Sequence, residues 1–304
     1  MTALRLILCL ALLPAAAHAR GPSQVCTDFA RDLAQRPGTA SIDGRVLNDA
    51  LFEAASINCV DMARDLLARG ALLSARDRFG ASALGVAAQH GARDVAALLL
   101  AAGAPVDRRD LSHATPLLRA AEAGRRRMVA DLLVVGADVN AFNDQGVTPM
   151  IAASFGGHGR IVQTLIAAGA DADALAEDGK SALSYAAGRG FADVVALLLD
   201  AGAAPDRPGG HALTPLMWAA GHSNDAPAAE GVRTATLLLE AGADPRSRDD
   251  RGRDALMIAA ARGHTAMIAL LLDHGADLTA RDNIGKTAMA LAETDAARAA
   301  LSRP

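Results

Sequence analysis

Apolar residues follow one repeated pattern along most of this chain. A pair of aliphatic residues is followed, three residues later, by Gly-Ala, as in Leu198-Leu199 and Gly202-Ala203. Successive pairs are separated by 33, 33, 33, 33, 40 and 33 residues. The pairs begin at Leu66, Leu99, Leu132, Leu165, Leu198, Leu238 and Leu271. A fixed period of this length indicates stacked repeats, in which each unit buries its apolar face against its neighbours.

Polar residues before each apolar run predict where the helices begin. Each unit starts with a residue that can cap a helix N-terminus, namely Asp49, Ser82, Thr115, Thr148, Ser181, Thr214, Asp254 or Thr287. Pro116 follows one of them, at a position where the helix needs no N–H group. A glycine such as Gly190 ends this first helix. The aliphatic pair then marks the buried stripe of a second helix, which the glycine of Gly-Ala can end in a left-handed conformation.

The predicted fold is an all-α repeat solenoid of helix-turn-helix units joined by short loops. The loops, such as residues 138–146, are polar and rich in turn residues, so we expect hairpin-like fingers there. The solenoid is expected to span residues 47–301 in about eight units. The last unit has no Gly-Ala and is expected to be a truncated C-terminal cap.

These units resemble the ankyrin repeat, a 33-residue unit with the signature Thr-Pro-Leu-His-x-Ala and two antiparallel helices. Thr115-Pro116-Leu117 and Thr214-Pro215-Leu216 reproduce the start of the signature. One departure is consistent, because the signature histidine is replaced in every unit. Its place is taken by Gly85, Leu118, Ile151, Ser184, Met217, Met257 and Ala290. We therefore expect apolar packing to contribute more to the stacking than it does in the family pattern.

The first residues of the chain are typical of an exported protein. An apolar run from Leu6 to Leu13 is followed by Ala17-His18-Ala19, which fits the cleavage rule of a secretory signal. Residues 1–19 are thus predicted to be a signal peptide, and the run is too short to span a bilayer. Residues 20–46 are predicted to form an N-terminal cap with a helix over 27–36. The expected location is the periplasm of a Gram-negative host or the exterior of the cell, without stable insertion in a membrane.

Two cysteines remain after removal of the signal peptide, Cys26 and Cys59. An even pair in an exported chain favours a disulfide, here closing a loop of 59 − 26 = 33 residues. The alternative is two separate thiols. A zinc site is poorly supported because two cysteines without clustered histidines do not supply the usual ligand set.

Charge and composition narrow the classes of function. The formal net charge is −4 and both signs are interspersed, so there is no basic surface of the kind that binds nucleic acid. Aromatic residues are 3% of the chain, which requires a core closed by Ala and Leu. The sequence shows no nucleophile, general base and orienting group that would form a catalytic site. His158 and His264 each follow the glycine in the middle of a repeat, where we expect a structural role. We expect neither a catalytic site nor a metal or cofactor.

The remaining class of function is the binding of another protein. The resemblance implies that partner contacts lie on a concave face made by the fingers and the first helices. The residues predicted to contact a partner protein are Arg78, Phe79, Gln89, His90, Glu122, Gln145, Phe155, Lys180, Arg189, Arg251 and Arg262, with Leu111, Asp144, Glu177, His211, Arg253 and Ile284 as further variable positions. Phe79, Phe155 and Ile284 stand out because aromatic and apolar side chains often anchor interfaces. Each could instead pack against the next repeat.

The period fails once, where 40 − 33 = 7 extra residues fall within 221–231. Insertions in repeat arrays form loops on one face, often the binding face. Four of the residues there are candidates for contact: His222, Asn224, Asp225 and Glu230. A tolerated surface loop is the alternative, since lengthening a loop costs little free energy.

The function predicted from the sequence is that of a non-catalytic, monomeric scaffold that binds another protein in the cell envelope. The resemblance to bacterial ankyrin-like proteins also allows support of a periplasmic redox enzyme. One alternative is an inhibitor or immunity protein against an exported toxin or enzyme. A hydrolytic enzyme is a further alternative, which would need a pocket with a cluster of titratable groups.

Overall fold

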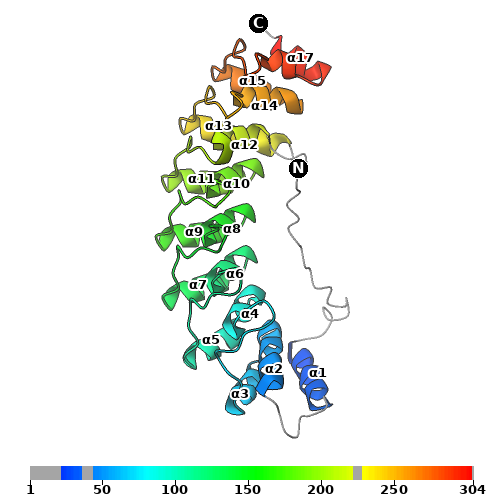
Figure 1. Ribbon diagram of the computed structural model, residues 1–304, viewed down its shortest axis with the longest axis vertical. Coiled ribbons are helices and arrows are strands. Elements are labelled where there is room, and N and C mark those ends of the chain that lie inside the picture. The colour runs from blue at the N-terminus through cyan, green and yellow to red at the C-terminus, as the bar shows by residue number, and fades with distance from the viewer. Residues whose placement is uncertain (1–21, 36–43, 222–227, 303–304) are drawn as a thin grey trace.

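The computed structural model describes residues 22–35, 44–221 and 228–302 of the 304-residue chain, and they form an all-α solenoid of paired helices (Figure 1). Helix α1 (Pro22–Gln35) comes before the pairs. The first helices are α2 (Gly44–Ile57), α4 (Ala83–His90), α6 (Pro116–Glu122), α8 (Pro149–Phe155), α10 (Ala182–Gly188), α12 (Pro215–Ala220), α14 (Ala255–Arg262) and α16 (Ala288–Leu291). The second helices are α3 (Val60–Ala68), α5 (Arg93–Ala101), α7 (Arg126–Val134), α9 (Gly159–Ala167), α11 (Ala192–Asp200), α13 (Ala228–Glu240), α15 (Thr265–Asp273) and α17 (Asp295–Leu301). Within the described ranges the only β pairing is an isolated bridge between Leu175 and Ser181.

The predicted capping of the first helices is confirmed from the second unit onward. The Thr115 hydroxyl accepts a hydrogen bond from the Leu118 N–H at 3.3 Å, and the other capping residues make the equivalent bond. Every glycine of the Gly-Ala pairs has a positive φ, as a left-handed helix end requires. The expectation for Asp49 is wrong, because Asp49 lies inside α2, which begins earlier, at Gly44.

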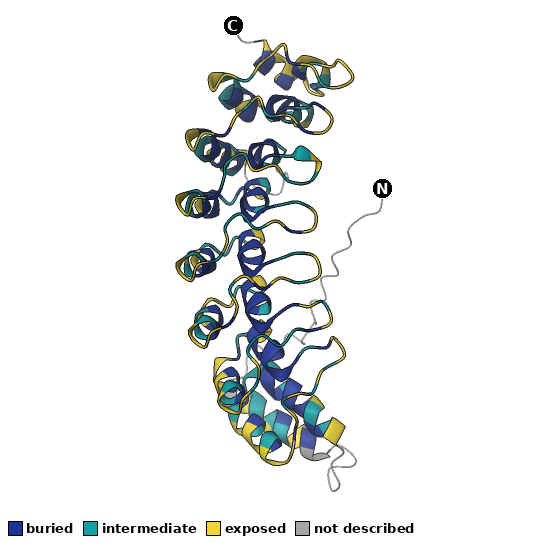
Figure 2. Cartoon of the chain, turned by 60° about the vertical axis from the view of Figure 1, so that its left-hand side comes forward, coloured by how far each residue is buried: buried dark blue, intermediate teal, exposed yellow. Residues whose placement is uncertain are grey.

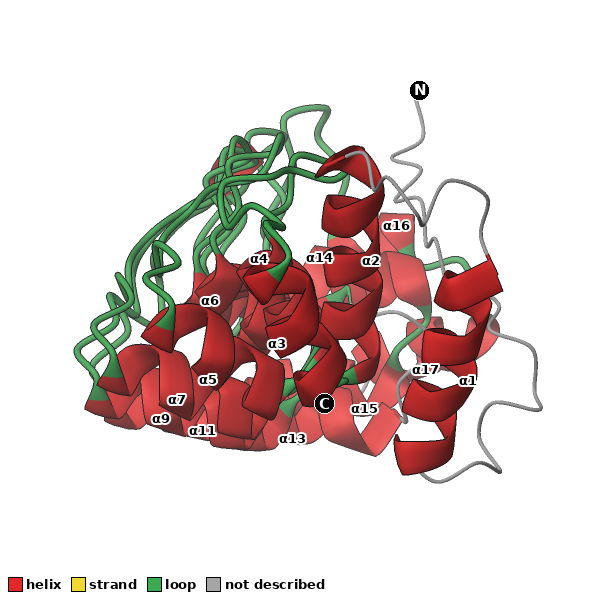
Figure 3. Cartoon of the chain, turned by 90° about the horizontal axis from the view of Figure 1, so that it is seen from below, coloured by secondary structure: helices red, strands yellow, loops and turns green. Residues whose placement is uncertain are grey.

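The core lies between the two rows of helices. The first leucine of each aliphatic pair is fully buried in all seven units. Figure 2 shows the same burial along the inner sides of both rows. Seen end-on in Figure 3, the loops project together at one edge of the stack, away from the second helices. The stack is bowed, with the first helices on the inner side of the curve, which is the concave face of the protein (Figure 1).

Backbone hydrogen bonds join the tips of neighbouring fingers. The Leu111 N–H donates to the Phe79 carbonyl at 3.1 Å, and the Glu177 N–H donates to the Gln145 carbonyl at 2.7 Å. Most fingers are also closed internally by a carboxylate or amide, as where Asp77 accepts bonds from the N–H groups of Phe79 and Ala81. The fingers are therefore a hydrogen-bonded row that holds its tips at fixed positions.

The N-terminal end of the stack is covered by α1. Cys26 on α1 forms a disulfide with Cys59, which precedes α3, with the two Cα atoms 5.6 Å apart. Phe29 and Leu33 of α1 are buried in the common core. The helix is longer than the one predicted over 27–36, since it begins at Pro22. The predicted signal peptide lies outside the described residues.

The extra residues of the long unit are partly helical. Helix α13 has 13 residues, whereas the equivalent helix α11 has 9. Part of the insertion thus adds about one turn to a second helix. His222, Asn224 and Asp225 lie outside the described residues, and Glu230 lies in the first turn of α13 beside Arg233, with an N–O distance of 3.6 Å.

Candidate partner-binding surface

One position recurs in six of the first helices, from α4 to α14, on the side of the fingers. It is occupied by Val86, Arg119, Ala152, Tyr185, Trp218 and Ile258, spaced by 33 residues except for the last interval of 40. Arg119 and Tyr185 show the direction of this row, because each forms a hydrogen bond with a carboxylate of the preceding finger. The side chains that can contact a partner therefore lie in this row, at the ends of the first helices and at the finger tips.

Cationic and aromatic side chains gather at the middle of the concave face. We name Phe155, Lys180, Tyr185, Arg189, Phe191 and Trp218 the aromatic–cation cluster. The rings of Phe155 and Tyr185 meet edge to face, with centroids 5.5 Å apart. The Lys180 ammonium lies 5.1 Å from the Tyr185 centroid and 4.9 Å from that of Trp218. The cluster includes four of the eight aromatic residues of the chain.

Asp178 fixes one side of this cluster. It accepts hydrogen bonds from the Lys180 ammonium at 2.5 Å and from the Tyr185 hydroxyl at 2.8 Å. Burial raises the pKa of Asp178, but these bonds outweigh burial and lower the pKa overall. Burial, together with the bond to Asp178, raises the pKa of the Tyr185 hydroxyl. Asp178 is thus held ionised and Tyr185 protonated, which makes the Lys180 side of the cluster internally neutralised and rigid.

A second polar contact on the face joins α6 to the finger that precedes it. Arg119 donates to Asp110 Oδ2 from Nε at 2.8 Å and from Nη2 at 2.6 Å. Burial raises the pKa of Asp110, and the bonds from Arg119 and Ser112 overcome it, so the pKa lies below its ordinary value. Arg119 also binds Glu122 at 3.0 Å. These charges are satisfied within the protein and hold the finger against α6.

The predicted contact residues fall in two places on the concave face. The finger residues are Arg78, Phe79, Gln145, Lys180 and Arg251, and those at first-helix ends are Gln89, His90, Glu122, Phe155, Arg189 and Arg262. The structure brings Phe155, Lys180 and Arg189 into one cluster, while the others are spread along the stack. Phe79 and Phe155 keep 58% and 40% of their surface exposed, and Ile284 keeps 75%. Phe155 nevertheless contacts the next repeat through Tyr185, so it has both a packing and a surface role.

Sequence reasoning missed Tyr185 and Trp218 as surface residues. The signal was available, since 218 − 185 = 33 places both at one repeat position, which Arg119 also occupies. A charged residue at that position marks it as facing solvent.

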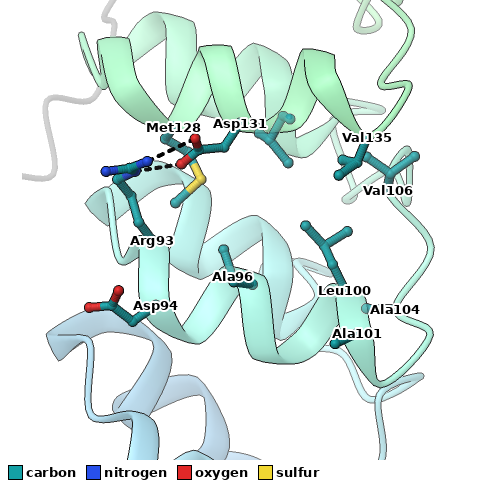
Figure 4. A pocket seen from close by; sticks show the side chains of 12 residues that line it. Arg93, Asp94, Ala96, Leu100, Ala101, Ala104, Val106, Met128, Asp131 and Val135 are labelled. Carbon is teal, nitrogen blue, oxygen red and sulfur yellow. Dashed lines mark hydrogen bonds and ion pairs between the residues drawn. The ribbon is translucent and has the colours of Figure 1, made fainter.

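A groove lies on the opposite side of the stack, between α5 and α7 (Figure 4). Its volume is about 750 Å³ and its walls are mainly apolar, with Ala96, Leu100 and Val135 among them. At one end Arg93 and Asp131 form a two-bond ion pair, with distances of 2.5 and 2.9 Å. Arg93 and Asp131 therefore satisfy each other, and the third charged residue of the lining, Asp94, accepts a hydrogen bond from the Asn58 amide at 2.9 Å.

The two histidines assigned to structural places pack against the preceding repeat. A Cβ atom added at Gly124 would lie 2.8 Å from the His158 ring, so that ring lies directly on the glycine backbone. His264 Nδ1 lies 3.0 Å from the Ala220 carbonyl oxygen. In the part of the chain that the structure describes, no three His, Cys, Asp or Glu side chains are grouped as metal ligands require. A search of the same residues for a helix able to cross a membrane finds none.

Three family models for ankyrin repeats match the chain. A model of three ankyrin repeats matches residues 51–143 and 149–227, a model of many copies matches 238–292, and a single-repeat model matches 212–250. No curated protein sequence matches the chain. Among solved structures, the human ASB11 ankyrin repeat domain superposes with a TM-score of 0.65 at 28% identity, covering 73% of this chain and 96% of that one. The repeat period, the capped helix pairs, the finger row and these matches show that the chain belongs to the ankyrin repeat family.

Proposed function

We propose that this protein binds a partner protein in the cell envelope through its concave face, with the aromatic–cation cluster as the anchor. Ankyrin repeats generally mediate protein–protein interactions, which supports the class of function. The observation that carries the site is the grouping of the exposed Phe155 and Arg189 with the half-buried Tyr185 ring. Aromatic residues and arginine dominate the energetics of protein interfaces because they bury a large area at low entropic cost.

The location in the envelope rests on the N-terminal sequence and on the cysteine pair. The Cys26–Cys59 disulfide fits a compartment in which disulfides persist. Recovery of the protein from the periplasm with Arg20 as its first residue would support export. An intact N-terminus at Met1 in the cytoplasmic fraction would contradict it.

The binding site is tested by affinity capture from an envelope extract. The chain is immobilised as wild type and as a triple variant in which Phe79, Phe155 and Arg189 are changed to Ala. We expect the triple variant to lose at least about tenfold of the specifically captured protein, since each anchor side chain contributes more than about 1 kcal/mol.

A matched control changes three exposed residues of α7 on the outer side, Arg126, Arg127 and Val134, to Ala. This control is expected to capture as much as the wild type. Equal capture by the concave variant, or loss only in the α7 variant, would show that the concave face is not the binding site. Circular dichroism of all three proteins checks that the stack is intact.

A further inference from the structure

We infer that Arg189 is a preformed binding site for a side-chain carboxylate, so that the partner presents an Asp or Glu beside an apolar residue. This inference rests on the proposed function of the concave face and specifies the chemistry of the partner.

The Arg189 guanidinium is held between two rings. Its Cζ atom lies 4.6 Å from the Phe155 centroid and 5.4 Å from the Phe191 centroid. Rings stacked on a guanidinium cover its faces, while its N–H donors point outward in the plane of the group. A side chain held in this way loses little rotamer freedom on binding, which is what favours affinity in a preorganised site. Arg189 is thus restrained by two rings while its side chain stays exposed, so its forked donors remain accessible to an oxygen pair.

Arg189 differs from the other cation of the cluster in having no carboxylate. Lys180 also lies over two rings, but Asp178 neutralises it and its side chain is only 22% exposed. Arg189 is exposed, and among the described residues no acidic side chain forms an ion pair with it. The cluster therefore holds one cation with a carboxylate partner, Lys180, and one without such a partner among the described residues, Arg189.

The concave face carries both cationic and acidic side chains. Three further exposed arginines form no ion pair within the described ranges: Arg78, Arg251 and Arg262. Of the acidic residues predicted on this face, Glu122 shares Arg119 with Asp110, Asp144 contacts a histidine, His113, rather than an arginine or lysine, and Glu177 forms no ion pair among the described residues. The face as a whole is therefore mixed in charge. Arg189 is set apart by its contacts with two rings, and an acidic side chain is its complementary partner because opposite charges across an interface favour encounter and specificity.

An apolar neighbour is expected next to the carboxylate. The Phe155 ring that supports Arg189 is 40% exposed, so a residue adjacent to the bound carboxylate would lie against that ring. Covering the ring also removes water from the guanidinium, which strengthens the charged hydrogen bonds. The expected motif is Asp or Glu followed or preceded by an aliphatic or aromatic residue.

The inference is tested with random dodecapeptides displayed on phage and selected on the immobilised full chain at low salt. We expect the selected peptides to carry an Asp or Glu next to an apolar residue. A selected peptide, synthesised with an amidated C-terminus so that its only carboxylates are side chains, is then titrated by fluorescence anisotropy. Arg189→Leu is expected to raise the Kd by about tenfold to a hundredfold, the range for a hydrogen bond between charged groups.

The matched control is Arg262→Leu, which removes an exposed arginine at the same repeat position but not stacked between rings. It is expected to change the Kd less than about threefold, as exposed charges do. Replacing the peptide carboxylate by its amide should weaken binding to the wild type but not to Arg189→Leu, and Arg189→Lys should not restore binding because an ammonium has no fork.

Two results would overturn the inference and leave the concave face as the binding site. One is selection of basic or uncharged peptides that the Phe79, Phe155 and Arg189 triple variant no longer binds. The other is selection of acidic peptides whose Kd rises equally in Arg189→Leu and Arg262→Leu. If the selected peptides bind the triple variant as tightly as the wild type, both the inference and the proposed function fail.

Discussion

Filling the groove between α5 and α7 should stabilise the protein. The substitution is Ala96→Val, at a wall of the groove where the alanine side chain is directed toward α7 (Figure 4). Neighbouring repeats place Val129, Val162 and Val195 at this position, and all three are fully buried. Valine at position 96 would thus add two methyl groups to the wall of the groove, as at the equivalent positions of those repeats.

The expected gain follows from the two added methyl groups. Burying them contributes about 0.8 kcal/mol each, or about 1.6 kcal/mol in total. Valine is less favourable than alanine in a helix by about 0.5 kcal/mol. The net increase in the free energy of unfolding is therefore about 1 kcal/mol, which corresponds to a rise in Tm of about 2 °C for a chain of this size.

Urea unfolding followed by far-ultraviolet circular dichroism measures this gain. Fluorescence of Trp218, the single tryptophan, follows the same transition from the middle of the stack and tests whether the repeats unfold together. The matched control is Val162→Ala, which removes the same two groups from a closed position. We expect it to lose about 2 kcal/mol, the transfer term plus a cavity term.

A lower urea midpoint for Ala96→Val, with an unchanged slope, would refute the reasoning. It would mean that α5 and α7 cannot accommodate the larger side chain and that the groove is maintained by their packing. A loss in Ala96→Val equal to the loss in Val162→Ala would lead to the same conclusion.

Two further predictions concern the N-terminal disulfide and a buried cap. Changing Cys26 and Cys59 to Ser together should lower the free energy of unfolding by about 3 to 4 kcal/mol, because a 33-residue loop is freed in the unfolded chain; an unchanged urea midpoint would contradict this. Burial raises the pKa of Asp254, so the folded state binds the proton of this carboxyl more tightly than the unfolded state does. The ionised Asp254 therefore lowers the free energy of unfolding at pH values above its raised pKa. Asp254→Thr, the residue found in other repeats, should therefore stabilise the protein at neutral pH, with a gain that shrinks as the pH falls through the raised pKa toward the unfolded value. A gain that is constant across this pH range, measured by urea unfolding, would show that the charge of Asp254 is not the cause.

The sequence by itself determined the units of this fold. A helix cap such as Thr115 needs only the N–H group three residues later, and a left-handed glycine needs only its own backbone. The buried leucines recur at one period, so the core could be predicted from the pattern alone. Asp49 was the exception. It occupies the repeat position of a cap, but the helix already begins at Gly44, so Asp49 lies inside it.

Only the tertiary structure decided which surface residues act together. Phe155, Tyr185 and Trp218 belong to three different units, and their contacts through Lys180 and Arg189 depend on the rotation between repeats and on side-chain rotamers. The groove beside Ala96 likewise depends on the separation between α5 and α7. A small residue at position 96 permits this separation, but the sequence alone does not show it. Periodic, local interactions repeat along the sequence and can be recognised in it, whereas pairings across repeats arise once, from the geometry of the assembled stack.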